Sequence, residues 1–347
     1  MNTEREDQNF EREENERLRA AFDSYNSSNS SQTSFEEDEW EYIVDRYIDL
    51  NDEPKAKRAA EEGFSAHPYS SSLLVKYCDS LVIAKEFQKT IEILDNYRDS
   101  FPPNSDILLS YCRVYIGMKD IVKARGYFNQ SMEIESFPED ICDSVHTLAQ
   151  DCMEIGEFEE ALYYLDRTEQ LTKLWNDKNH SKEKAENIAS LYFDYAFCNE
   201  KLDKNEEALN YYEKYLDLDP FSDIVWYNVG AIYTKKQLYG KAHEALDYAI
   251  ALNSKNPSAL FNMGHVCLEL GLFTAAVEYL EEYNKIEKNS PDGIASLAMG
   301  YLYLGDLTQA EILLRKALIF DPNHQMALIG LAEVQTEKKL RKKMRKR

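Results

Sequence analysis

An alanine recurs every 34 residues in the second half of the chain, and this period constrains the fold more than any other feature of the sequence. The alanines are Ala208, Ala242, Ala276 and Ala310. A second column of small residues keeps the same register and consists of Ala196, Gly230, Gly264 and Ala298. Periods of roughly 20 to 50 residues are typical of repeat proteins, in which each unit packs mainly on its neighbours.

Each unit predicts two short amphipathic helices, because its apolar residues recur at helical spacing. Neither helix can bury its apolar face alone, so neighbouring units must stack to form a continuous core. The small residues then mark points of close helix approach, where a larger side chain would overpack the core at a cost of about 1 to 3 kcal/mol. No alternating apolar pattern suggests a strand, and we expect an all-α chain.

The same frame extends towards the N-terminus, with two insertions. Further units are expected at residues 37–70, 71–104, 105–138 and 142–175. The alanine spacing grows to 37 residues between Ala124 and Ala161 and to 47 residues between Ala161 and Ala208. The second surplus falls on residues 176–188, a polar insertion that we expect to form lengthened helix ends and a polar turn.

This pattern resembles the tetratricopeptide repeat (TPR), which also has 34 residues and begins W-x2-L-G-x2-Y. Trp226 and Gly230 match that signature, Ala242 follows at the expected place, and Pro220 closes the preceding unit. The resemblance covers residues 37–324 as TPR units 1–4 (37–175) and units 5–8 (189–324). It implies an all-α fold: a right-handed superhelical α-solenoid of eight TPR helix pairs.

Two terminal segments lie outside the repeats. We expect residues 1–36 to form an acidic, partly disordered segment with a marginal helix and a Ser-rich linker. Residues 325–347 are expected to form a capping helix, which covers the last unit through Leu328, Leu331 and Ala332 and carries a basic tail.

The basic tail, residues 338–347, carries eight positive charges on a chain whose net charge is −23. Three interpretations remain open: a solvated helix end, a contact with RNA, ribosome or an anionic surface, or a clamp on the acidic body. Nucleic acid is not expected along the repeats, because phosphate binding needs positive potential.

Catalytic motifs are missing from the sequence, and we expect neither an enzyme nor a cofactor. The six histidines share no motif, no Cys/His spacing suggests a metal, and the six cysteines are interpreted as reduced packing residues. No segment has the length and apolarity of a signal peptide or membrane span, which leads us to expect a cytoplasmic protein.

The TPR resemblance implies that the concave surface, lined by the first helix of each pair, binds an extended peptide or helix. Candidates carried over from the family's positions form an apolar and aromatic groove: Phe193, Phe197, Tyr227, Asn228, Phe261, Asn262, His265, Met299 and Tyr303. The first unit instead offers an acidic end: Asp38, Glu41, Asp45 and Asp49. The cation pairs of the family's carboxylate clamp for chaperone tails are missing.

Asn228 and Asn262 occupy equivalent positions and resemble the asparagine ladder of other TPR superhelices, where the amide binds a peptide backbone. The alternative is that each amide bonds a neighbouring helix or water. We interpret the chain as a non-catalytic scaffold or adaptor for a protein or peptide partner. A regulator whose basic tail contacts RNA, ribosome or an anionic surface is the alternative. The partner, the pathway and the oligomeric state are not specified by the sequence.

Overall fold

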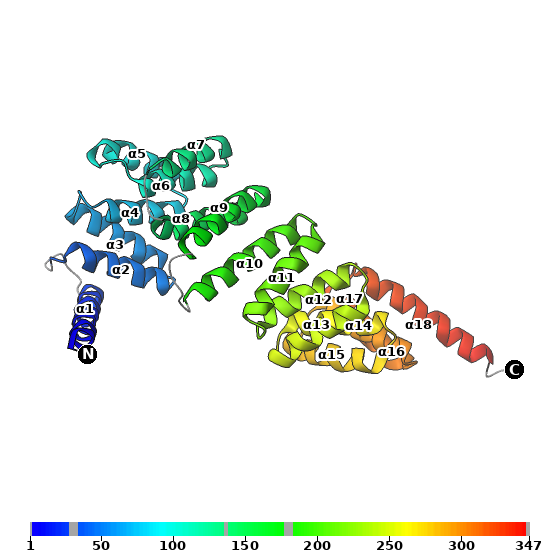
Figure 1. Ribbon diagram of the computed structural model, residues 1–347. Helices are drawn as coiled ribbons and strands as arrows, with labels where there is room; N and C mark the ends of the chain where they lie inside the picture. The colour runs from blue at the N-terminus through cyan, green and yellow to red at the C-terminus, as the bar shows by residue number, and fades with distance from the viewer. Residues whose placement is uncertain (1, 28–33, 135–137, 177–182, 345–347) are drawn as a thin grey trace. The chain divides into compact units, whose positions relative to one another are not determined.

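The computed structural model describes residues 2–27, 34–134, 138–176 and 183–344, which form eighteen α-helices, one short 3-10 helix and no β-strand (Figure 1). The chain divides into two compact units, Met1–His180 and Ser181–Arg347. In each of them, successive helices pair through short turns, as the sequence predicts.

The first compact unit begins with α1 and continues through four helix pairs. Its helices are α1 (Asn2–Ser27), α2 (Glu37–Asp49), α3 (Glu53–Ala66), α4 (Ser71–Ile83), α5 (Phe87–Tyr97), α6 (Ser105–Gly117), α7 (Ile121–Met132), α8 (Pro138–Ile155) and α9 (Phe158–Asn176). The 3-10 helix η1 (Arg98–Ser100) follows α5.

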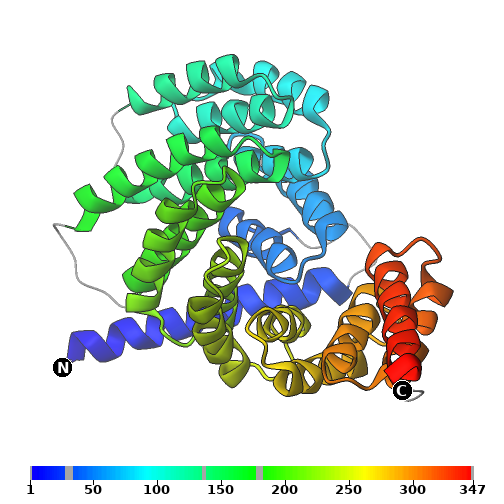
Figure 2. The same cartoon turned by 90° about the vertical axis from the view of Figure 1, so that its right-hand side faces the viewer.

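The second compact unit contains four further pairs and a final helix. Its helices are α10 (Glu183–Lys201), α11 (Asn205–Leu218), α12 (Asp223–Lys235), α13 (Tyr239–Leu252), α14 (Pro257–Glu269), α15 (Phe273–Ile286), α16 (Pro291–Tyr303), α17 (Leu307–Phe320) and α18 (Gln325–Met344). Figure 2 shows α18, in red, beside the orange α16 and α17.

The turn inside each pair contains one residue in the left-handed backbone conformation, and these residues follow the spacing of the alanine column. They are Asn51, Lys85, Lys119, Gly156, Asp203, Gln237, Gly271 and Gly305, with φ between 56° and 83°. Successive residues of this set are 34 positions apart, with two exceptions. Gly156 follows Lys119 by 37 positions, and Asp203 follows Gly156 by 47 positions. The backbone therefore repeats the two insertions found in the sequence. That all eight pairs are TPR units remains a prediction.

The small residues stand at helix contacts, as expected. Ala124, Ala208, Ala242, Ala276 and Ala310 are all completely buried. A Cβ atom on Gly230 would lie 2.7 Å from Leu246 Cγ, and one on Gly264 would lie 2.5 Å from Leu280 Cγ. These positions therefore leave no room for a larger residue without a shift of the facing leucine.

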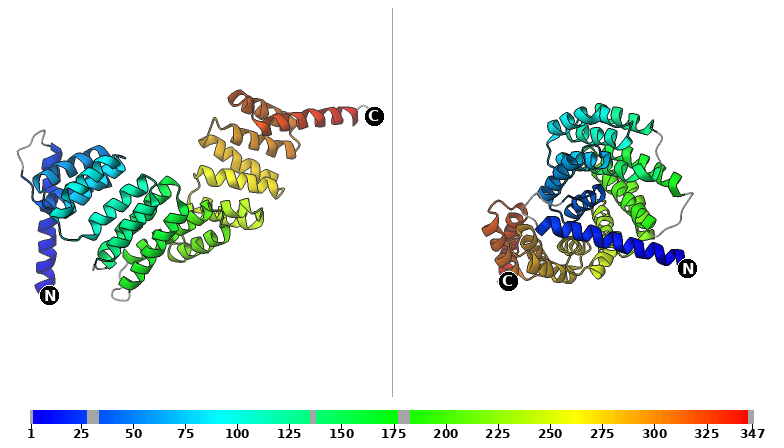
Figure 3. Two further views of the ribbon diagram at one scale, coloured as in Figure 1. Left: turned by 90° about the horizontal axis from the view of Figure 1, so that it is seen from above. Right: turned by 90° about the vertical axis from the view of Figure 1, so that its left-hand side faces the viewer.

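The sequence did not predict that α1 packs on the first helix pair. Ala21 is buried, the Phe22 and Tyr47 rings lie 5.1 Å apart, and the Tyr25 and Trp40 rings lie 5.3 Å apart. This end of α1 covers the apolar face of α2, while its N-terminal part extends beyond α2 (Figure 3). The Ser-rich linker falls mostly on residues 28–33, outside the described residues.

The capping helix is present as α18, but two of the three residues predicted to form its buried face are wrong. Leu328 and Ala332 are exposed, whereas Leu331 is partly buried and packs on the core of the last unit. The buried positions are instead Ala327, Gly330 and Val334, one residue away in register. Helical periodicity alone allows either set of residues to face the last unit. The set with smaller side chains is the one that packs on α16 and α17, because small side chains let α18 approach these helices more closely.

The helices beside the second insertion are long, with 19 residues in both α9 and α10. The expected polar turn falls on residues 177–182, outside the described residues. All six cysteines are buried and free. Burial raises the pKa of Cys267 to about 11, so this thiol stays protonated at neutral pH.

Candidate peptide-binding groove

The predicted groove residues lie on the first helices of four successive pairs. Phe193 and Phe197 belong to α10, and the remaining residues are distributed over three helices: Tyr227 and Asn228 on α12, Phe261, Asn262 and His265 on α14, Met299 and Tyr303 on α16. Eight are partly buried, whereas Tyr303 is exposed. This partial burial leaves part of each side chain accessible to a ligand.

Three of these residues, Tyr227, Phe261 and Asn262, line one hollow of about 320 Å³. The hollow also includes two residues that the sequence did not single out, Tyr283 and Glu287 at the end of α15. The Phe261 and Tyr283 rings lie 5.1 Å apart. The repeat register points only to the first helix of each pair, so the contribution of α15 could not be predicted from it.

The two equivalent asparagines have different surroundings. Asn228 Nδ2 donates a hydrogen bond of 3.1 Å to Tyr212 Oη, which in turn donates to the Glu200 carboxylate at 3.2 Å. Burial, followed by the charge of Glu200, raises the pKa of Tyr212, so its hydroxyl remains a donor at neutral pH. The Asn228 amide therefore bonds a residue of a neighbouring helix, which is the alternative to binding a peptide backbone.

Asn262 makes no side-chain hydrogen bond within the part of the chain that the structure describes. Its amide lies at the 320 Å³ hollow, beside Tyr227 and Phe261. An amide offers both a donor and an acceptor, which is what an extended peptide backbone requires. Of the two asparagines, Asn262 is therefore the one available to a ligand.

The other candidates do not line this hollow. Phe193 packs against Tyr212, with ring centroids 6.0 Å apart, and Phe197 lies beneath the Lys201 ammonium at 4.9 Å. His265 Nε2 is 3.9 Å from a Glu269 oxygen. Tyr303 and Phe273 have ring centroids 5.0 Å apart, and Met299 approaches Gly330 of α18. A groove continuous over all nine residues therefore remains a prediction.

Ion pairs offset much of the charge at the acidic end. Asp38 pairs with Arg17 of α1, and Asp45 pairs with Lys76 of α4 at 2.5 Å. Asp49 lies 3.1 Å from Arg46 on its own helix. The first two pairs could not be predicted from the sequence, because their partners come from other helices.

The described part of the basic tail continues α18 and contacts α17. Lys338 pairs with Glu311, and Arg341 Nη1 donates to the Gly305 carbonyl at 3.1 Å. Lys338, Arg341 and Lys342 line a hollow of about 600 Å³ beside the turn before α17. Residues 345–347 lie outside the described residues.

The described residues include no group of three or more His, Cys, Asp or Glu side chains arranged to hold a metal ion. Within the same residues, we find no helix with the length and apolarity needed to cross a membrane.

Stacked helix–turn–helix pairs with small residues at their contacts define a helical-repeat protein. Two family models of the tetratricopeptide repeat match the chain, at residues 189–222 and 235–293. The matched residues are therefore tetratricopeptide repeats, and the described residues form an all-α solenoid of stacked helix pairs.

One curated relative is a BBSome complex member BBS4 homolog from Drosophila melanogaster, 27% identical over 184 residues. The match covers 53% of this chain and 35% of the relative, so the chain corresponds to about a third of that protein.

Solved structures with similar folds include the APC/C hetero-tetramer Cut9–Hcn1, at 19% identity and a TM-score of 0.44, covering 91% of this chain and 59% of that chain. YrrB, described as a TPR protein with an unusual peptide-binding site, has 20% identity and a TM-score of 0.47 over 56% of this chain and 96% of YrrB. A fragment of MamA from Desulfovibrio magneticus, residue 41 to the end, has 18% identity and a TM-score of 0.45 over 54% of this chain and 98% of the fragment. These weak likenesses say nothing about the function of this chain.

Proposed function

We propose that this protein is a non-catalytic scaffold or adaptor that binds an extended segment of a partner protein on the surface formed by α12, α14 and α15. The observation that carries the proposal is the hollow where Tyr227, Phe261 and Asn262 meet. Aromatic rings there offer apolar contact area, and the Asn262 amide offers backbone hydrogen bonds without reading a particular sequence.

The partner segment binds with its backbone along Asn262 and one apolar side chain between Tyr227 and Phe261. Partly buried aromatic side chains beside a polar group are typical of sites where a few residues carry most of the binding energy. Phe193, Phe197 and Asn228 extend the proposed surface on one side, and the α16 candidates extend it on the other. Their contribution is smaller, because several already pack against neighbouring side chains.

The test begins with a peptide selected from a random library on the full chain, with affinity measured by fluorescence polarisation. Asn262→Ala should weaken binding about twofold to tenfold, from the loss of a bond that contributes about 0.5 to 1.5 kcal/mol. Asn210→Ala, an exposed asparagine on α11, is the matched control and should have no effect. N-methylation of the peptide amide that meets Asn262 should cost affinity in the wild type only.

A different result would place the working surface elsewhere. If Asn262→Ala and Tyr227→Ala leave the affinity unchanged, while charge reversals at Glu41 and Asp45 abolish binding, the acidic end binds the partner. The groove assignment is then wrong. Circular dichroism of each variant must match the wild type, so that loss of binding is not loss of fold.

The hollow beside Lys338, Arg341 and Lys342 favours a second candidate function, in which the tail contacts RNA, ribosome or an anionic surface while the repeats hold a protein partner. Such binding should weaken steeply between about 50 and 200 mM salt. A chain ending at Glu337 should lose it. If RNA or anionic vesicles bind the shortened chain equally well, the tail is a solvated helix end.

A further inference from the structure

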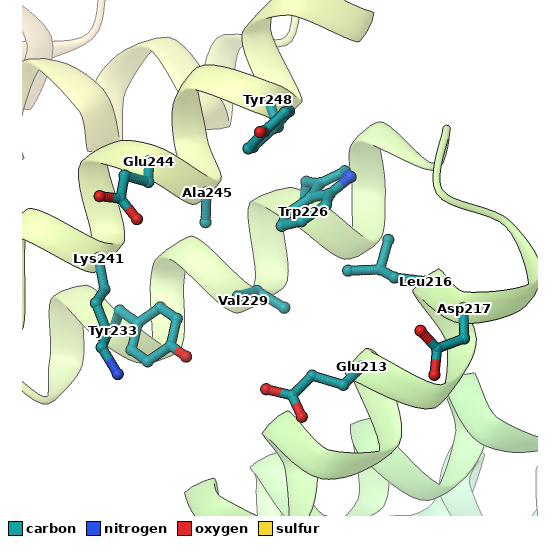
Figure 4. Close-up of a pocket in the computed structure, with 10 residues that line it drawn as sticks. All are labelled: Glu213, Leu216, Asp217, Trp226, Val229, Tyr233, Lys241, Glu244, Ala245 and Tyr248. Atoms are coloured by element: carbon teal, nitrogen blue, oxygen red, sulfur yellow. The ribbon is translucent and has the colours of Figure 1, made fainter.

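A third hollow lies between α11, α12 and α13, and it has a volume of about 510 Å³ (Figure 4). It is separate from the hollow at Asn262, because the two hollows share no lining residue. Trp226, which the repeat pattern predicts only as a packing residue, forms part of its wall. The repeat pattern does not predict an opening there.

Aromatic rings form one side of this hollow. Trp226 and Tyr248 stack with their ring centroids 4.7 Å apart and an interplanar angle of 24°. The indole Nε1 of Trp226 donates a hydrogen bond of 2.9 Å to the Pro220 carbonyl, which holds the ring in this orientation. Tyr248 is 57% exposed, so the stack remains accessible to solvent.

Carboxylates surround the same hollow. Figure 4 shows Glu213 and Asp217 on the α11 side, and Glu244 with Lys241 on α13. Within the described residues, none of the three carboxylates forms a hydrogen bond or an ion pair. The single cation, Lys241, lies 5.4 Å from the centroid of the Tyr233 ring. Three acidic groups and one basic group leave the hollow with a net negative charge.

We propose that this hollow binds an arginine side chain presented by a basic segment of a partner protein. A guanidinium can stack on the Trp226–Tyr248 face and form hydrogen bonds with the carboxylates at the rim. Anionic ligands are disfavoured by the negative charge. A metal ion is disfavoured too, because the described residues hold no cluster suited to one.

Arginine fits this site better than lysine for two physical reasons. Its planar guanidinium matches both an aromatic face and the fork of a carboxylate, whereas an ammonium is a compact and more strongly hydrated charge. Its weaker hydration also lowers the cost of leaving water for a half-open hollow. The body of the chain, with its net negative charge, would attract a basic segment before the specific contacts form.

The proposed site is independent of the peptide groove, which is tested by Asn262. Trp226 and Tyr227 are neighbours in sequence, but they line different hollows. A variant that abolishes one site therefore need not affect the other, and failure of either proposal can be recognised separately.

The experiment is a nuclear magnetic resonance titration of the full chain with two short peptides that differ in one residue, arginine or its neutral isostere citrulline. The chain has three tryptophans, and comparison with Trp226→Phe assigns the Trp226 indole signal. We expect the arginine peptide to shift this signal at millimolar concentration and the citrulline peptide to leave it in place.

Variants then separate the two contributions. Tyr248→Leu should weaken arginine binding about twofold to fivefold, the range expected for an exposed cation–π contact. Glu213→Gln, Asp217→Asn and Glu244→Gln together should weaken it about tenfold or more. The matched control neutralises Glu207, Asp247 and Glu278, which are exposed acidic residues that do not line the hollow. That control should change the affinity less than twofold.

Several results would overturn the proposal. One is an equal shift of the Trp226 indole signal with the arginine and citrulline peptides, and another is no shift of that signal at 10 mM arginine peptide. A third is an equal loss of affinity in the triple carboxylate variant and in its control. A lysine peptide that binds as tightly as the arginine peptide would contradict the guanidinium assignment. If Tyr248→Leu disturbs the fold, as judged by circular dichroism, the proposal is tested by the triple carboxylate variant and its control alone.

Discussion

Arg113 forms a largely buried ion cluster in the first compact unit, and its removal should be strongly destabilising. Its side chain is 13% exposed and lies between carboxylates from two other helices. Nη1 is 2.7 Å from Asp79 Oδ1 on α4, and Nε is 2.8 Å from Asp151 Oδ2 on α8. Burial lowers the pKa of Arg113, but the two carboxylates raise it by more, so the guanidinium stays charged.

The magnitude follows from the two carboxylates that Arg113→Met would leave without a cation. Breaking a buried pair typically costs about 3 to 5 kcal/mol. We expect about 3 kcal/mol near pH 8, at the lower end of this range, because Asp79 and Asp151 remain 31% and 20% exposed and can be rehydrated. Arg58→Met is the matched control, since Arg58 is 73% exposed and pairs with Glu62 in water, so its loss should cost far less than that of Arg113.

The cost should also depend on pH. Burial raises the pKa of Asp151 although Arg113 lowers it, and loss of Arg113 raises this pKa further. A folded-state pKa above the unfolded value favours the folded state at low pH, and this contribution is lost as pH rises through the folded-state pKa. The deficit of Arg113→Met should therefore be smaller at pH 5 than at pH 8.

Urea unfolding followed by far-ultraviolet circular dichroism at both pH values provides the measurement. Adding Asp79→Asn and Asp151→Asn to Arg113→Met should recover most of the lost stability and remove its pH dependence. The reasoning is refuted if Arg113→Met costs no more than Arg58→Met. It is also refuted if the deficit is the same at pH 5 and pH 8.

Two further predictions use glycines and can be checked by the same urea unfolding. Gly230→Ala should lower the free energy of unfolding by about 1 to 3 kcal/mol, because its Cβ would lie 2.7 Å from Leu246 Cγ. Gly240→Ala, at the second residue of α13, where a Cβ atom would meet no atom within 4 Å, should raise it by up to about 0.5 kcal/mol. At the left-handed turn positions, Gln237→Gly should stabilise the fold by about 1 kcal/mol and Gly271→Ala should destabilise it by a similar amount. A change of unfolding free energy with the opposite sign at Gly230 or Gly240 would contradict the packing argument. The opposite sign at Gln237 or Gly271 would contradict the argument from the left-handed backbone conformation.

The candidate site was only partly predictable from the sequence. The repeat register placed Tyr227, Phe261 and Asn262 on the first helices of their pairs, and the structure brings those three together. Register alone could not distinguish Asn262 from Asn228, because the difference comes from Tyr212 on a neighbouring helix.

The sequence by itself determined the helix pairs, their order and both insertions. That was possible because an exact repeat records local requirements many times: an apolar face at helical spacing and a small residue wherever two helices touch. Gly230 shows this requirement directly, since its position predicted the close contact that Leu246 makes.

Only the tertiary structure decided how particular surfaces are completed by other helices. It placed α1 over α2, selected Ala327 rather than Leu328 for the buried face of α18, and opened the hollow beside Trp226. Each of these depends on which side chains meet across two or three helices. A period along one chain specifies where a helix turns its apolar face, but not the shape of the neighbour that this face meets.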